Sequence, residues 1–175
     1  RKNWKNGSVN NQVKRNYLEI KSIKELVEVK KPLSNLYIEK VEPSNFELNK
    51  FFYKQIGRKH SWKDRLSWSN KNWIDYLNTP GVLTHILKNK DELVGYFEQN
   101  IYISQQECEI AYFGILEEYI GKKIGAYLLS EAIKKSFENG SKRVWVHTCS
   151  LDHKHALDNY LSRGMKVFKS ESLYL

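Results

Sequence analysis

The chain has 175 residues, and 29 Lys or Arg against 20 Asp or Glu give it a formal net charge of +9 at pH 7. With 41% hydrophobic residues, this length is typical of one globular domain that folds without disulfides or a structural metal. No apolar run reaches the ~18 residues of a membrane span, so we expect no membrane contact. The two cysteines, Cys108 and Cys149, lie in strand-like segments, and this usage favours a cytoplasmic location.

Positive charge is concentrated near the N-terminus, because residues 1–34 hold nine basic and three acidic residues. Residues 1–15 are rich in Lys and Asn without apolar periodicity, which predicts a flexible arm without structure. Two short runs, 17–21 and 24–29, are ambiguous. We therefore expect a basic, partly disordered arm over residues 1–34 and one domain over residues 35–175.

The predicted elements of that domain alternate between strands and helices. A strand at 36–41 precedes a helix at 46–56, capped by Ser44-Asn45, and a second helix runs from about residue 70 to Pro80-Gly81. Strands at 82–87, 93–103 and 109–116 are close enough for antiparallel hairpins. A helix at 121–139, a strand at 144–148, a helix at 153–163 and a last strand at 165–175 follow. This order predicts a mixed α/β layer fold.

The join between the strand at 109–116 and the next helix has the features of an anion site. Free N–H groups and the dipole at a helix start attract phosphate, and Gly121 and Gly125 let it approach the backbone. Lys122 and Lys123 would add positive charge. The alternative is a helix that uses glycines only to begin, and neither the P-loop nor the G-x-G-x-x-G pattern fits.

Two motifs in this region resemble those of a known superfamily. Its phosphate loop reads [QR]-x-x-G-x-[GA], and here residues 120–125 read Ile-Gly-Lys-Lys-Ile-Gly, with Ile120 first and Lys123 at the first glycine position. Its second motif, N-x-x-A-x-x-x-Y followed by Gly and an aromatic residue, is matched by Ala156, Tyr160 and Gly164, with His153 and Met165 at the other two positions. Residues 35–175 therefore resemble the GNAT superfamily of N-acetyltransferases. Runs such as 111–115 and 143–153 are most similar to an uncharacterised bacterial branch.

The resemblance implies a mixed, mostly antiparallel sheet flanked by helices on both faces. It also implies transfer of an acetyl group from acetyl-CoA to a primary amine, by direct attack within a ternary complex. The fourth and fifth strands of the domain should splay, so that the backbone binds pantetheine and one amide stabilises the oxyanion. The acetyl-CoA contacts implied are Phe113, Gly114, Ile115, Ile120, Gly121, Lys122, Lys123, Ile124, Gly125, Ala126, His153 and Tyr160.

Two residues are candidates for moving protons. Strand alternation puts Glu109 on the face of Ala111 and Phe113, where poor solvation would raise its pKa towards that of a useful general base; otherwise it is a half-exposed acid paired with a lysine. Glu98 and Glu107 are weaker candidates, because their surroundings resemble strand ends or turns. The resemblance makes Tyr160 a proton donor to the CoA thiolate, and the alternative is a core tyrosine of its helix.

The acceptor side has several candidates. Trp62, Asp64 and Arg65 would suit an amine or zwitterion, and His147 could face the acceptor as another base. The group formed by His147, Cys149, Asp152, His153 and His155 contains the residue types that bind zinc. Residues two apart on a helix point away from each other, and Asp152 fits an N-cap of the helix from His153, so we expect no metal.

Two other function classes remain open. One is a GNAT-like domain that binds acyl-CoA as a sensor or scaffold without catalysis. The other is a basic protein associated with nucleic acid, although no reading motif for RNA or DNA accompanies the charge. As partners we expect a small-molecule or peptide amine, with no membrane and no nucleic acid, for a monomer or homodimer. The sequence does not identify the acceptor.

Overall fold

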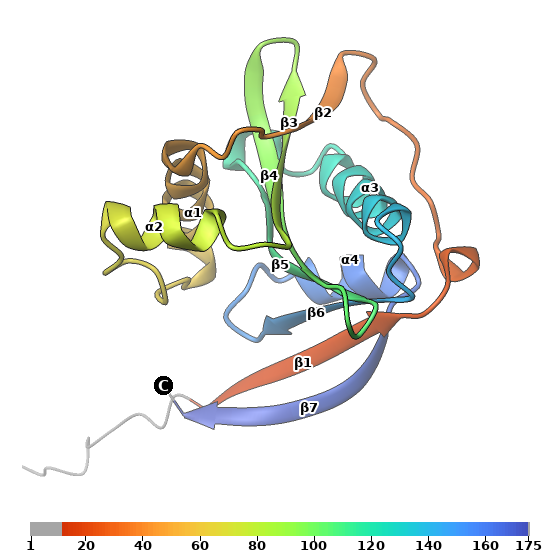
Figure 1. The fold of residues 1–175 in the computed structure, drawn as a ribbon. Helices are drawn as coiled ribbons and strands as arrows, with labels where there is room; N and C mark the ends of the chain where they lie inside the picture. The colour runs from red at the N-terminus through yellow and green to blue at the C-terminus, as the bar shows by residue number, and fades with distance from the viewer. Residues whose placement is uncertain (1–11, 175) are drawn as a thin grey trace, which may run out of the picture.

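The computed structural model describes residues 12–174, which form a seven-stranded sheet with the strand order β2-β3-β4-β5-β6-β1-β7 (Figure 1). All neighbouring strands pair antiparallel except β5 and β6, which are parallel. The strands are β1 (Gln12–Ile20), β2 (Leu36–Lys40), β3 (Val82–Asn89), β4 (Glu92–Tyr102), β5 (Glu107–Ile115), β6 (Arg143–Cys149) and β7 (Lys166–Tyr174).

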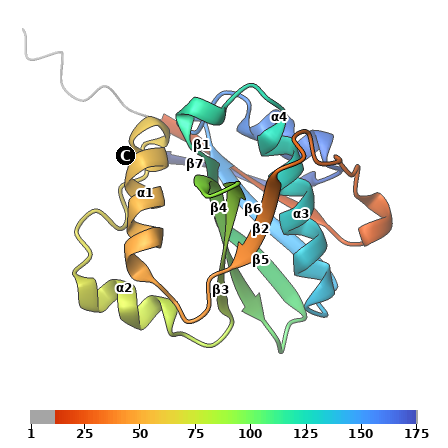
Figure 2. The ribbon, with the colours of Figure 1, turned by 90° about the horizontal axis from the view of Figure 1, so that it is seen from above.

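Helices cover both faces of this sheet (Figure 2). The helices α1 (Phe46–His60) and α2 (Asn70–Leu77) lie on one face, and α3 (Ile124–Glu138) and α4 (Ala156–Ser162) lie on the other. Leu128 of α3 belongs to the larger buried cluster, and Phe52 of α1 to the smaller one. The mixed α/β fold with helices on both faces is confirmed. No helix within residues 12–174 is long and apolar enough to cross a membrane.

Local signals explain where these helices begin and end. The Asn45 side chain accepts a hydrogen bond from the amide of Glu47 at 3.1 Å and caps α1. Gly164 follows α4 with φ +102°, and a Cβ there would lie 2.2 Å from a backbone oxygen, so only glycine fits. The expected starts at residues 121 and 153 are three residues too early, because a turn precedes each helix.

The N-terminal segment corrects the sequence interpretation. Residues 12–15, expected to lack structure, belong to β1, which lies between β6 and β7 inside the sheet; residues 1–11 of the expected arm are outside the described range. Val13, Leu18 and Ile20 are buried. A bulge after Tyr17 interrupts the alternation of buried and exposed residues along β1, so the sequence pattern did not predict a strand here. The sheet therefore includes a strand that precedes the domain boundary expected at residue 35.

A bulge in β5 changes which side chains share a face. Glu98 of β4 is paired with Tyr112 and Gln99 with Ile110, so Ala111 is an extra residue in β5. Glu109 therefore shares a face with Tyr112, and the expectation that it shares one with Phe113 is wrong. Simple alternation fails here because a bulge reverses the side-chain pattern.

The parallel strands β5 and β6 separate at their carboxyl ends. Their pairing covers only Glu107 to Glu109 of β5 and Arg143 to Trp145 of β6. Beyond that point each strand continues without the other, as the resemblance predicted. Such an opening at the carboxyl ends of parallel strands is a common ligand site in α/β proteins.

Candidate active site

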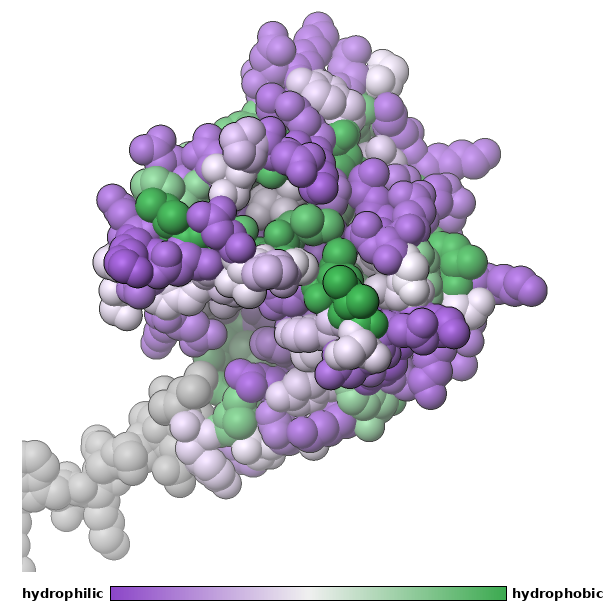
Figure 3. Space-filling view, in the orientation of Figure 1, coloured by the Kyte–Doolittle hydropathy of each residue, from purple (hydrophilic) through white to green (hydrophobic). Residues whose placement is uncertain are grey.

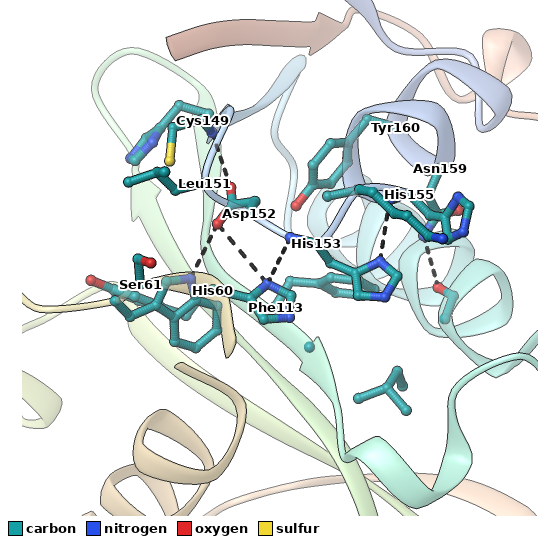
Figure 4. A pocket seen from close by; sticks show the side chains of 18 of the residues that line it. His60, Ser61, Phe113, Cys149, Leu151, Asp152, His153, His155, Asn159 and Tyr160 are labelled. Atoms are coloured by element: carbon teal, nitrogen blue, oxygen red, sulfur yellow. Dashed lines mark hydrogen bonds and ion pairs between the residues drawn. The ribbon is translucent and has the colours of Figure 1, made fainter. Parts of the chain in front are cut away.

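A cavity of about 880 Å³ occupies the opening between β5 and β6. Its walls come from the end of β5, the start of α3, α4, the connection after α1, β6 and β1. Figure 3 shows a mostly hydrophilic surface, with apolar side chains near the middle of the view, where Figure 1 has β5 and α4. Figure 4 shows the cavity from close by. This volume is typical of sites for small molecules and cofactors.

One end of the cavity is formed by the loop before α3. Gly121 has φ +89° with nothing within 4 Å of a would-be Cβ, and a Cβ on Gly125 would lie 3.8 Å from Ile115. The N-cap residue Lys123 makes no side-chain hydrogen bond to the start of α3, so the first N–H groups of this helix can bind an anion. Lys123, at the glycine position of the family motif, has φ 63°, which explains why a glycine suits that position.

The predicted acetyl-CoA residues divide into two groups. Gly114 lines the cavity, and a Cβ there would lie 2.6 Å from Ile56 of α1, so this glycine also permits helix packing. Lys122 lies over the Tyr119 ring and Ile124 is fully buried in the core, so neither lines the cavity. The others that do line it are Phe113, Ile115, Ile120, Gly121, Lys123, Gly125, Ala126, His153 and Tyr160.

Tyr160 is held in the middle of the cavity wall. Its ring centroid lies 6.4 Å from that of Phe113, and Asn159 beside it donates a hydrogen bond to the carbonyl oxygen of Gly125 at 3.2 Å. The hydroxyl points towards the loop that carries Asp152 and His153 (Figure 4). Burial raises the pKa of Tyr160 above its usual value, so the hydroxyl keeps its proton at neutral pH.

Asp152 connects the walls of the cavity rather than capping a helix. Its carboxylate accepts hydrogen bonds from the Thr148 hydroxyl, from the Cys149 amide at 3.0 Å and from the Trp62 indole at 3.4 Å. The expected N-cap role is wrong, because α4 begins only at Ala156. Trp62 is thereby tied to the loop after β6.

Sequence analysis missed His60, the last residue of α1. Its Nδ1 accepts a hydrogen bond from the His153 amide at 3.3 Å, and the two rings stack with centroids 5.8 Å apart (Figure 4). Burial lowers the pKa of His60. Because the contact joins segments 93 residues apart, no local motif could have revealed it.

His147 and Glu109 form a pair at the other end of the cavity. His147 lines the cavity, and its Nε2 lies 3.9 Å from Glu109 Oε2. Glu109 lies behind it, accepts a hydrogen bond from the Tyr102 hydroxyl at 3.2 Å and does not itself line the cavity. Desolvation and the positive charge of Arg15 lower the pKa of His147, which leaves the imidazole neutral and able to accept a proton at neutral pH.

Of the predicted acceptor residues, Trp62 and Asp64 line the cavity and Arg65 does not. Arg65 is 5% exposed and donates two hydrogen bonds to the buried carboxylate of Glu98, at 2.9 and 3.0 Å. Its guanidinium carbon lies 4.2 Å from the ring centroids of Tyr76 and Tyr112. Glu98 is thus a buried mid-strand residue rather than the strand-end residue expected. Glu107 pairs with Arg143 at 3.2 Å.

His153 and His155 lie in the turn before α4 rather than on the helix. Their ring centroids are 5.3 Å apart and the amide of His155 donates to His153 Nδ1, so the expectation that the two residues point away from each other is wrong. Within residues 12–174, no group of three His, Cys, Asp or Glu side chains could hold a metal ion.

Solved structures share this fold at low sequence identity. A GCN5-related N-acetyltransferase from Sphaerobacter thermophilus superposes with a TM-score of 0.70 at 15% identity, over 91% of this chain and 50% of that one. An aminoglycoside acetyltransferase from an uncultured soil metagenomic sample gives 0.61 at 16%, over 74% and 87%. The ribosomal-protein-S18-alanine N-acetyltransferase from Escherichia coli gives 0.57 at 17%, over 74% and 76%. The chain spans about half the length of the Sphaerobacter protein.

Sequence comparison agrees with the fold. A search of curated proteins finds no significant match. The sequence model of the acetyltransferase (GNAT) family matches residues 38–165, a span that includes the loop before α3, Tyr160 and the splayed strands. The chain belongs to the GNAT acetyltransferase family.

Proposed function

We propose that this protein transfers an acetyl group from acetyl-CoA to a primary amine by direct attack in a ternary complex. The proposal depends on one observation above all. A single cavity is lined by a glycine-containing helix start, by Tyr160 and by His147, and Glu109 lies behind His147 at 3.9 Å. These are the groups needed to bind a polyphosphate, assist a leaving thiolate and accept a proton from an amine.

The cofactor end fits the shape of CoA. The amides at the start of α3 would bind the pyrophosphate, with Lys123 nearby to add positive charge. Because β5 and β6 separate after Glu109 and Trp145, the backbone of β5 has groups free to bind pantetheine. Bound acetyl-CoA supplies a thioester whose carbonyl carbon an amine can attack.

The acceptor end supplies a base. His147 is neutral at pH 7 and faces the cavity, so it can take the proton that the attacking amine must lose. Glu109 stabilises the imidazolium that forms and orients the ring. This assigns the base role to His147 and makes Glu109 a positioning residue.

Tyr160 assists the departing sulfur. Burial raises the pKa of Tyr160 and so keeps the hydroxyl protonated and able to donate a hydrogen bond to the developing thiolate. Transfer of the proton becomes favourable only when desolvation also raises the pKa of the buried CoA thiol. Cys149 lines the cavity as well, but burial raises the pKa of its thiol. A protonated thiol is a weak nucleophile, which favours direct attack over an acyl-enzyme.

The test is a turnover assay with acetyl-CoA and a panel of primary amines, read as thiol release. We expect release with at least one amine, and a drop in kcat for Tyr160→Phe with little change in the Kd of CoA. Tyr37→Phe removes a hydroxyl from an exposed residue of β2 and is the matched control. CoA binding without thiol release from any amine would overturn the proposal and favour the non-catalytic sensor.

A further inference from the structure

The N-terminal strand β1 forms part of the cavity at the acceptor end. Arg15 is paired with Cys149 and Tyr17 with His147 in the antiparallel register of β1 and β6. Side chains two apart on a strand share a face, so Arg15 lies on the face of His147. Arg15, Cys149 and His147 all line the cavity.

Charges of both signs surround His147. The carboxylates of Glu109, Asp152 and Asp64 act on it electrostatically, and so does the guanidinium of Arg15. The acidic groups suit the amine of an acceptor. A cation at the same place repels an additional ammonium group and attracts an anion.

Arg15 has hydrogen-bond donors to spare. Its nearest acid is Glu171, at 3.7 Å from Nη1, and that carboxylate already accepts a hydrogen bond from Tyr17 at 2.7 Å. The Arg15 Nε is buried with no hydrogen-bond partner in the described part of the chain. A guanidinium carries five N–H donors in a geometry that matches a carboxylate. The buried Nε is out of reach of a ligand, but the side chain as a whole is 33% exposed and lines the cavity, so its outer N–H groups can bind an anionic ligand group.

We infer that the acceptor carries a carboxylate as well as its amine, and that Arg15 binds this carboxylate. The inference rests on the proposed function, because it assigns the acceptor end of the same cavity. An amino acid or a short peptide has this chemistry, whereas a polyamine does not. Arg15 is then a specificity-determining residue contributed by β1.

The experiment compares amines that differ only in the carboxylate. Phenylalanine is paired with phenethylamine and lysine with cadaverine, and kcat/KM is measured from thiol release. We expect the carboxylate-bearing member of at least one pair to be favoured roughly tenfold or more, the range of a hydrogen bond to a charged group. Calorimetric titration of the same pairs into the protein loaded with CoA reports binding without turnover.

Two neighbouring substitutions separate a specific contact from net charge. Arg15→Met keeps the aliphatic stem but removes the guanidinium, and we expect it to abolish the preference in both measurements. Lys14→Met removes the same charge from an exposed residue of β1 that the cavity does not include, and it should leave the preference unchanged. Thermal melts check that both variants fold.

The outcomes distinguish the inference from the proposed function. If amines are acetylated but the carboxylate gives no advantage, or if folded Arg15→Met keeps the advantage, the inference is overturned while the activity stands. If no amine is acetylated, the proposed function fails. In that case the binding measurement still tests the carboxylate site. Tighter binding of the carboxylate-bearing amine that is lost in Arg15→Met supports the inference, and equal binding of the two amines rejects it.

Discussion

At the residue scale, the most consequential contact outside the cavity is the buried pair of Glu98 and Arg65. Glu98 is fully buried and accepts hydrogen bonds from Arg65 and from Asn49. Arg65 follows Trp62 and Asp64, which line the cavity. The pair therefore fixes the connection after α1, and with it one wall of the acceptor end.

Removing one charge of this pair leaves the other buried without compensation. We expect Glu98→Gln to lower the free energy of unfolding by ~3 to 5 kcal/mol, as is usual for a broken buried ion pair. Urea denaturation measures the change. Glu39→Gln, which breaks an exposed pair with Lys88, is the control and should cost less than ~1 kcal/mol. Equal losses in the two variants would contradict this account.

His85 should make stability depend on pH. Burial lowers its pKa to about 4, and the charges of Lys135 and Lys40 act in the same direction. Between about pH 6.5, its ordinary pKa, and about pH 4, the unfolded state binds more protons than the folded state. The free energy of unfolding should therefore fall as the pH drops through this window.

Denaturation at pH 7 and pH 5 tests this dependence. We expect the loss of stability to be smaller in His85→Gln than in the unmodified protein, because the substitution removes one group whose folded pKa is depressed. Replacing the exposed His155 by Gln provides the comparison. A loss that is unchanged in His85→Gln would show that His85 does not couple to folding.

The proton acceptor can be assigned by a pH profile of kcat. We expect His147→Gln to lower kcat by about 10² to 10⁴, the range of a lost general base, and to abolish the decline in rate below pH 6.5. Glu109→Gln should lower kcat less and shift that decline to lower pH, because it removes the negative charge that favours protonated His147. A larger effect from Glu109→Gln would return the base role to Glu109.

At the scale of elements, the loop before α3 is the feature with the clearest test. A Cβ on Gly125 would make only ordinary contacts, at 3.8 Å from Ile115 and 4.0 Å from Asn159, so Gly125→Ala should fold and bind CoA nearly normally. Gly125→Val adds two methyl groups beside the helix start. We expect it to weaken CoA binding at least tenfold, or ~1.4 kcal/mol, as calorimetry would show. An unchanged Kd in a folded Gly125→Val protein would refute the loop assignment.

The elements that sequence analysis predicted are those with local signals. The cap at Asn45, the stop at Gly164 and the motif containing Tyr160 each depend on residues within a few positions of one another. The errors concern features that a partner strand decides. The bulge at Ala111 is defined by the pairing of β5 with β4. Because of it, Glu109 lies on the opposite face of the sheet from Phe113.

The same distinction applies to the candidate site. Gly121, Gly125 and Tyr160 belong to motifs that the sequence shows, and they line one cavity. Arg65 was misplaced because its buried partner Glu98 is 33 residues away in the sequence. Arg15 was overlooked because its strand is recognisable only between β6 and β7.

At the scale of the whole molecule, the strand order separates the two halves of the proposed reaction. In the proposed function, the start of α3 and α4 form the CoA end, and these two helices follow the parallel strands β5 and β6. The proposed acceptor end includes β1, which comes from the N-terminal part of the chain but lies between the C-terminal strands β6 and β7. Shortening the chain from its N-terminus should therefore affect the acceptor end first.

Two truncations test this separation. Removing residues 1–15 shortens β1 by four residues and deletes Arg15, so the pairs of Val13 with Leu173 and of Arg15 with Cys149 are lost. We expect the melting temperature to fall by several degrees, since about 1 kcal/mol corresponds to ~2 to 4 °C at this chain length.

Calorimetry at a temperature where the protein stays folded should give a Kd for CoA within about twofold of the full chain, a difference of less than ~0.5 kcal/mol. Removing residues 1–11 spares β1 and should change neither quantity. If the longer truncation instead weakened CoA binding as much as it lowered acceptor turnover, the two ends would not be separate, and β1 would have to support the whole cavity rather than its acceptor end.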